Sequence, residues 1–170
     1  DIRAALNFIC GGIGSGLVVA GALFAGQQPP LLPLALGVAL MGAGLFSVWL
    51  EIGRPLRAVN VIFNPRTSWM AREALLAPVV IGLAAAVAFG WQWAAPLLAL
   101  AALLYCYAQG RMISAARGIP AWRDPMVPTL IVTTALAEGF GLFVILGALQ
   151  GGAALAAVAF AALAAFSRFL

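Results

Sequence analysis

The stretch AALNFICGGIGSGLVVAGALFA, residues 4–25, contains no charged side chain and is long enough to cross a membrane. A transmembrane α-helix needs about 20 consecutive, predominantly apolar residues. Similar apolar runs follow at approximately residues 32–50, 69–89, 94–113, 126–149 and 153–166. With their short connections, these runs account for almost the whole chain. The sequence therefore predicts an all-α fold, a polytopic transmembrane bundle of about six helices, in a single domain over residues 1–170.

The composition is typical of a membrane protein and excludes several soluble classes. Of the 170 residues, 65% are hydrophobic and 8% are charged, whereas soluble domains carry about 25% charged residues. The basic residues are all arginines and are scattered over short loops. Since no continuous basic face is expected to follow phosphates, nucleic acid is excluded as a partner. The predicted partner of the outer surface is membrane lipid.

The sequence contains no histidine, which removes several kinds of site. A haem or a zinc or copper ion held by histidine is excluded, as is a Ser/His/Asp or Cys/His catalytic arrangement. Cys10 and Cys106 each lie inside an apolar run and lack a C-x-x-C partner. We therefore expect two small buried residues here, and no metal site in this chain.

The arginines predict the orientation of the bundle. The connections after the first, third and fifth runs are uncharged, whereas 51–68 and 114–125 are polar and contain arginines. With six crossings, all arginines fall on one face, which the positive-inside rule makes cytoplasmic. The tryptophans fall at span ends, where amphipathic rings prefer the interface. Because the chain begins at Asp1 and ends beside an apolar segment, we expect it to be part of a longer protein.

Two carboxylates lie at neighbouring helix ends on the arginine-rich face. Glu51 ends the second span and Glu73 lies in the first turns of the third, so both have the same depth and could line one pocket. A structural role is the alternative for each. Glu51 could pair with Arg54, since a carboxylate at a helix C-terminus is disfavoured. Glu73 could simply be a favourable charge near the start of a helix that begins at 64–65 or 67–68.

Glu138 lies deeper in the membrane. It is ten residues beyond Pro128, which places it about 15 Å into the fifth span. Ionisable groups at that depth are costly, so we expect Glu138 to face the bundle. It would then serve either a proton route or a hydrogen bond between helices.

Two groups of motifs resemble a known family. The first is EIGRPLRA at 51–58 with NPRTSWMARE at 64–73. It resembles the loop between the second and third helices of the dimethyl sulfoxide reductase membrane-anchor family, within the wider NrfD and polysulfide-reductase-like anchors. The second group is QGRMI at 109–113, GIPAWR at 118–123 and AEG at 137–139. It is most similar to anchors of the sulfite dehydrogenase and phenylacetyl-CoA oxidoreductase types, whose catalytic subunits face the cytoplasm.

The resemblance implies a membrane-anchor subunit of a molybdenum and iron–sulfur oxidoreductase. Anchors of that family hold a ferredoxin-like, four-cluster iron–sulfur subunit and a molybdopterin catalytic subunit. They exchange electrons with menaquinone or ubiquinone in the bacterial inner membrane, in anaerobic respiration, and carry no haem. They have eight or more helices, which again implies that this chain is part of a longer subunit.

The resemblance also implies roles for individual residues. Glu73 matches the acidic residue linked to quinone binding and proton transfer. Glu51 stands where many members have histidine. Since a quinone carbonyl accepts a hydrogen bond, Glu51 would contact it only when protonated, or through an arginine or a water molecule. Alternatively, Glu51 would act as a proton acceptor. Arg54 and Arg57 would orient the ring or contact the partner. The other candidates for cofactor binding in these motifs are Ser68 and Arg72.

Two alternatives from other classes remain open at this point. A transporter or proton-conducting bundle would use Glu73 and Glu138 as substrate or ion sites, and an inverted repeat would favour it, although no convincing repeat is present. A purely structural anchor would lack a quinone site altogether.

Overall fold

Five long helices make up the part of the chain that the computed structural model describes. This part comprises residues 2–25, 30–51, 60–116, 118–147, 158–159, 161–162 and 165–166. The helices are α1 (Ile2–Leu23), α2 (Leu31–Glu51), α3 (Trp69–Ala88), α4 (Ala95–Ala115) and α5 (Val127–Ile145), with short 3₁₀ helices η2 (Gln92–Ala94) and η3 (Pro120–Arg123). Each long helix is long and apolar enough to cross a membrane.

The predicted all-α fold is confirmed for the described residues, which contain no strand. The expected bounds of the first five spans agree closely with α1 to α5, except that α5 ends at Ile145, four residues before the predicted limit. The sixth predicted span, 153–166, lies largely outside the described residues. It therefore stays a prediction.

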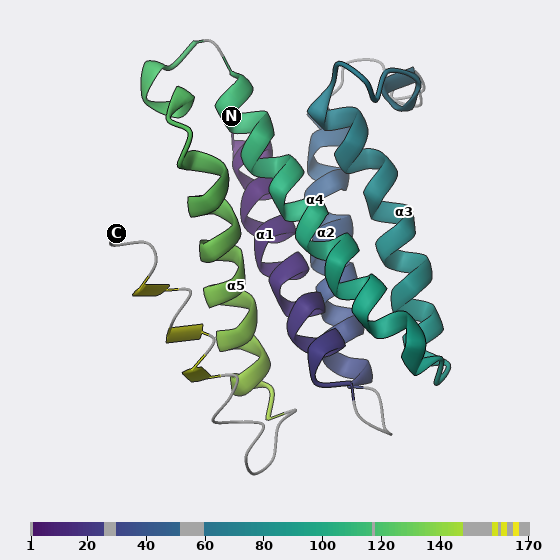
Figure 1. The fold of residues 1–170 in the computed structure, drawn as a ribbon. Coiled ribbons are helices and arrows are strands. Elements are labelled where there is room, and N and C mark those ends of the chain that lie inside the picture. The colour runs from purple at the N-terminus through teal and green to yellow at the C-terminus, as the bar shows by residue number, and fades with distance from the viewer. Residues whose placement is uncertain are drawn as a thin grey trace.

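The helices run alternately up and down, so that the described arginines gather at one end. The start of α1, the segment before α3 and the connection from α4 to α5 all lie at the top of Figure 1. We call this the arginine end. The arginines that it contains are Arg3, Arg66, Arg72, Arg111 and Arg123. The remaining ones, Arg54, Arg57, Arg117 and Arg168, lie outside the described residues. The side of the membrane on which this end lies stays a prediction.

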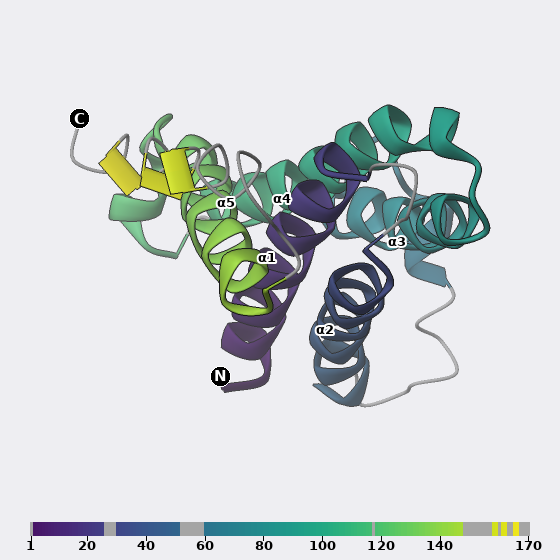
Figure 2. The same cartoon turned by 90° about the horizontal axis from the view of Figure 1, so that it is seen from below.

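Helix α1 is the centre of the bundle and packs against α2, α4 and α5 (Figure 2). Glycines allow the close approach. A Cβ atom on Gly14 would lie 2.6 Å from the carbonyl oxygen of Gly37 on α2, and Gly16 packs directly on the backbone of α5 at Ala135 and Gly139. Small residues at such contacts are typical of membrane helix pairs. Gly42 on α2 is different, because no described atom lies within 4 Å of a Cβ placed there.

Helix α3, which carries Glu73, has a defined start. Ser68 has an extended backbone and its side chain accepts a hydrogen bond from the amide of Ala71. This is the behaviour of an N-cap residue, and it confirms 67–68 rather than 64–65 as the beginning of the helix. Trp69 is then the first helical residue. Its position at the helix end agrees with the interfacial placement expected for the tryptophans.

Candidate functional site

A buried cluster of polar side chains lies between α1, α3 and α4, close to the arginine end. Its centre is Glu73, which is 2% exposed. The side-chain amide of Asn7 donates to Glu73 Oε1 at 3.2 Å, and that of Gln109 donates to the same oxygen at 2.8 Å. The Gln109 amide also donates to the backbone carbonyl of Asn7 at 3.1 Å. Three helices are thus joined through one carboxyl group.

The chain brings these residues together because they lie at similar depth, near the starts of α1 and α3 and near the end of the antiparallel helix α4. Asn7 follows the start of α1 by five residues, Glu73 follows the start of α3 by four, and Gln109 precedes the end of α4 by six. These offsets correspond to about 6–9 Å along each helix, measured from the same end of the bundle. Burial of such groups in a membrane bundle is tolerated when they bond to one another.

The cluster also contains polar atoms that have no hydrogen-bond partner among the described residues. These are Asn7 Oδ1, Gln109 Oε1 and the hydroxyl of Tyr105, all buried. Tyr105 is on α4 one turn from Gln109 and interacts electrostatically with Glu73. Buried polar groups in native proteins are nearly always bonded, so such a concentration calls for an explanation. Two of the three are acceptor oxygens, so the interior of the cluster has fewer hydrogen-bond donors than acceptors.

A pocket of about 270 Å³ opens next to the cluster. Its lining is mainly apolar and comes from four helices: Ala4, Asn7, Phe8, Val48, Glu51, Met70 and Met112. Asn7 therefore belongs both to the pocket wall and to the hydrogen bonds around Glu73. Small-molecule sites commonly combine an apolar lining with a few placed polar groups. The polar groups here are the amide of Asn7 and the carboxyl of Glu51.

The structure brings some of the candidates from the sequence together and separates others. Glu51 lines the pocket, and Glu73 lies behind it, bonded to Asn7. Ser68 caps α3, and Arg72 donates hydrogen bonds to the carbonyl oxygens of residues 65 and 66. Neither residue is part of the pocket wall. Arg54 and Arg57 lie outside the described residues. The expected ion pair between Glu51 and Arg54 therefore stays a prediction.

The expectation that Glu138 faces the bundle is wrong for the part of the chain that is described. Glu138 is exposed. The packed face of α5 contains Ala135, Gly139 and Phe143. Successive residues of an α-helix differ by about 100° in direction around the axis. The side chain of Glu138 therefore lies off the packed face. Distance along a helix gives the depth of a side chain but not the direction in which it points. Glu138 neither bonds to Glu73 nor lines the pocket beside it.

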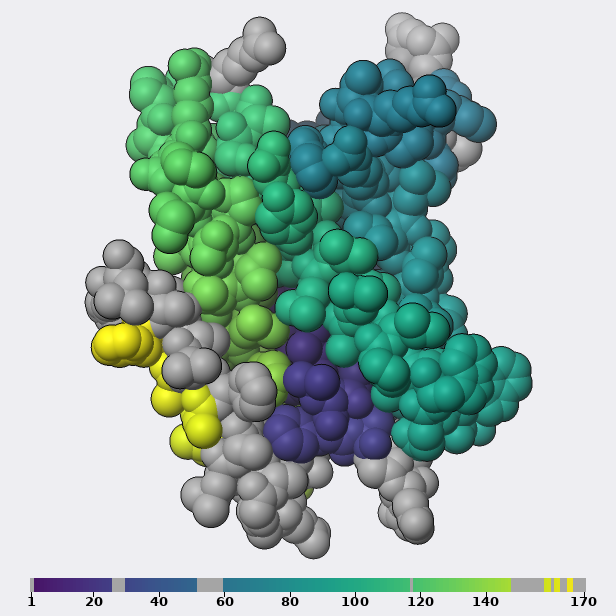
Figure 3. Space-filling view, in the orientation of Figure 1, coloured from purple at the N-terminus to yellow at the C-terminus, as the bar shows by residue number. Residues whose placement is uncertain are grey.

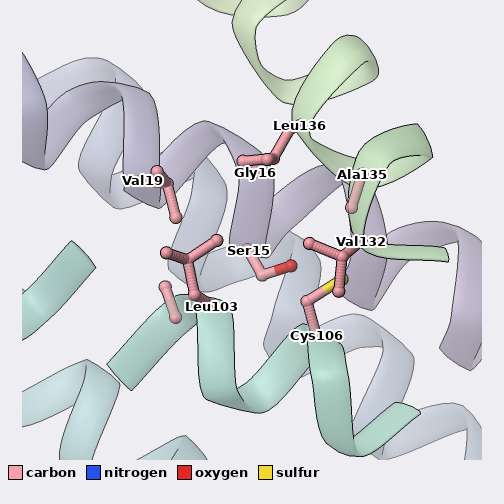
Figure 4. Close-up of a pocket in the computed structure, with 9 residues that line it drawn as sticks. Ser15, Gly16, Val19, Leu103, Cys106, Val132, Ala135 and Leu136 are labelled. Carbon is pink, nitrogen blue, oxygen red and sulfur yellow. The ribbon is translucent and has the colours of Figure 1, made fainter. Parts of the chain in front are cut away.

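A second hollow lies deeper, between α1, α4 and α5 (Figure 4). Ser15 and Cys106 extend into it, and Val132 and Ala135 of α5 close it. It leaves no room for a water molecule. The hydroxyl of Ser15 donates to the carbonyl of Gly12 at 3.0 Å. This hollow is therefore a feature of helix packing and not a second site.

Sequence reasoning did not identify Asn7, Gln109 or Tyr105 as site residues. A signal was present, because an amide side chain near the end of an otherwise apolar span needs a partner. Asn7 and Gln109 are such residues, and both lie at the depth of Glu73. Which sides of the helices face each other could not be read from the sequence, since apolar residues surround these helices on all sides.

These features define a multi-pass helical membrane protein with a buried carboxyl cluster beside a pocket at its arginine end. Within that class, the chain is similar to the C subunit of the sulfite dehydrogenase of Allochromatium vinosum. The two are 30% identical over 125 residues, which cover 61% of this chain and 38% of the length of that protein. The relationship confirms the resemblance to sulfite dehydrogenase-type anchors. No family model matches the sequence, and no solved structure matches it.

Proposed function

We propose that the protein is the quinone-reactive membrane-anchor subunit of a multisubunit molybdenum and iron–sulfur oxidoreductase. The observation that supports this most strongly is the shared position of Asn7, in the wall of the pocket and in hydrogen-bond contact with Glu73. A pocket for a small aromatic headgroup then lies next to a buried group that can exchange protons. The relationship to the C subunit of a sulfite dehydrogenase supports the assignment to an oxidoreductase.

The pocket suits the headgroup of a quinone or quinol. Phe8, Met70 and Met112 provide apolar and polarisable surfaces, and methionine sulfur makes favourable contacts with aromatic rings. The carboxylate of Glu51, exposed at the pocket wall, can accept a hydrogen bond from a hydroquinone hydroxyl, and Asn7 connects that wall to Glu73. Ala4 lies near the start of α1 and Glu51 is the last residue of α2, both at the arginine end. The headgroup would therefore be held near the aqueous interface.

Oxidation of a hydroquinone to a quinone releases two electrons and two protons. In this proposal the electrons pass to an iron–sulfur cluster of a protein docked at the arginine end. Glu73 takes one proton, and Glu51, which is exposed at the pocket wall, transfers the other to water. Quinone reduction is the same sequence in reverse, with both carboxyl groups as donors. The arginine end is cytoplasmic by the positive-inside rule, so the docked subunits are too.

The alternative of a transporter gains no support from the structure. It would need Glu73 and Glu138 in one pathway, but Glu138 is exposed on α5 and is not part of the pocket wall. The exposed position of Glu138 makes it a useful control for tests of Glu73.

The test is quinone turnover by the intact complex that carries Glu73→Gln. The amide keeps the size of the side chain but cannot take up the proton, so turnover falls by about a hundredfold. Electron transfer from the catalytic subunit to a soluble dye, which bypasses the anchor, stays unchanged. Glu138→Gln, the matched control, leaves both activities unchanged. Quinone turnover that survives Glu73→Gln would exclude the proposed role.

A further inference from the structure

Two arginines from different helices converge on one tryptophan at the arginine end. The guanidinium carbon of Arg72 on α3 lies 4.0 Å from the ring centre of Trp69, and that of Arg111 on α4 lies 5.0 Å from it. The indole also makes an edge contact with Tyr107 at 5.9 Å between ring centres. We call Trp69, Arg72 and Arg111 the Arg-Trp-Arg cluster.

The positive charge of this cluster is not neutralised by the described residues. Arg72 donates to the carbonyl oxygens of Pro65 and Arg66, at 2.8 and 3.0 Å, and forms no ion pair there. The Nε of Arg111 is buried and has no hydrogen-bond partner in the described part of the chain. The neighbouring carboxylate, Glu73, is turned inward and bonded to amides. Two guanidinium groups that lie 4.0 and 5.0 Å from the centre of one indole ring are therefore available to an anion with oxygen acceptors, such as a phosphate.

An exposed apolar surface lies directly below the cluster, toward the middle of the membrane. On α4, Leu97, Leu100, Leu104 and Tyr107 are 40–54% exposed and recur every three or four residues, ending at Arg111. On α3, Leu75 and Val79 continue the line of Arg72 in the same way and are 38% and 49% exposed. Helices α3 and α4 pack against each other and form one outer wall of the bundle (Figures 1 and 3).

We propose that this wall binds an anionic phospholipid, with its phosphate at the Arg-Trp-Arg cluster and its acyl chains along the apolar surface. Basic pockets between membrane helices on the cytoplasmic side are suited to such headgroups. An acidic segment of a soluble partner protein could reach the guanidinium groups. It would leave the apolar surface below them uncovered, whereas a lipid satisfies both parts at once. The site is separate from the quinone pocket, which none of the three cluster residues lines.

The test is lipid binding to the full-length protein in detergent, measured by native mass spectrometry. Phosphatidylglycerol or cardiolipin is titrated against phosphatidylcholine as the uncharged competitor. We expect an arginine that contacts the lipid phosphate to contribute about fivefold in affinity for anionic lipid. We therefore expect Arg111→Gln to weaken anionic lipid binding about fivefold and the double variant with Arg72→Gln about thirtyfold. Phosphatidylcholine binding stays within about twofold of the wild type, because its headgroup carries no net charge.

The control variant is Arg123→Gln, which removes a charge from the same end but from η3. It should bind anionic lipid like the wild type. Equal loss in Arg123→Gln and Arg111→Gln would contradict a specific site, because general surface charge would then explain the binding. Unchanged lipid affinity in the double variant, with loss of a copurifying soluble protein, would identify the cluster as a protein contact and overturn the proposal.

Discussion

Replacement of Gln109 by leucine tests whether the buried cluster holds the three helices together. The variant Gln109→Leu removes the bond of 2.8 Å to Glu73 and the bond of 3.1 Å to the backbone of Asn7. A hydrogen bond to a charged group contributes about 1.5–3 kcal/mol in soluble proteins. In membranes measured couplings average about 0.6 and reach about 1.7 kcal/mol, because the unfolded helices find other partners. With two bonds lost, we expect the free energy of unfolding to fall by about 2 kcal/mol.

The assay is reversible unfolding in mixed micelles, carried out as a double-mutant cycle with Glu73→Leu. If the bond between the two side chains is responsible, Gln109→Leu costs about 0.6–1.7 kcal/mol less when Glu73 is already leucine. The matched control is Gln92→Leu on η2, whose amide nitrogen and oxygen form no hydrogen bond with any described residue. That change should cost less than about 0.5 kcal/mol. Equal costs for the two glutamine variants, or no coupling to Glu73, would refute the reasoning.

Further predictions concern the packing of α1 and the start of α3. Gly16→Ala inserts a Cβ against the backbone of α5 and should destabilise the protein by about 1–3 kcal/mol in the same unfolding assay, whereas Gly42→Ala meets no atom within 4 Å and should not destabilise it. Ser68→Ala removes the cap of α3 and should cost about 1 kcal/mol, with faster hydrogen exchange at the amide of Ala71; Ser68→Asp, which can also cap, should restore both.

The helices could be predicted closely because membrane thickness fixes their length. The run expected at 32–50 is observed as Leu31–Glu51, and the run expected at 69–89 as Trp69–Ala88. The placement of Glu51 and Glu73 at one end follows from the same connectivity, since both flank one loop. Successive membrane-spanning helices alternate in direction, so the number of crossings alone decides at which end each loop lies. The position of the described arginines at one common end was therefore also predictable.

The contacts between helices could not be predicted, because they depend on rotation about each helix axis. Glu138 shows this most clearly, since its expected depth said nothing of the side it would face. Asn7 and Gln109 are 102 positions apart, and only the assembled bundle shows that they share Glu73 as a partner. Apolar residues cover both the buried and the lipid-facing sides of these helices, so hydrophobicity does not distinguish one side from the other.

Photochemical labelling with an azidoquinone tests the central claim, that the pocket beside Asn7 binds the quinone headgroup. In the intact complex we predict labelling of peptides that contain Met70 or Met112, suppressed by excess unlabelled quinone. Ala4→Trp, which fills the pocket from its wall, should abolish this labelling, and Ala5→Trp on the exposed side of α1 should leave it intact. Two results would contradict binding of the headgroup in this pocket. One is labelling that unlabelled quinone suppresses but that is confined to other segments, and the other is equal labelling in both variants.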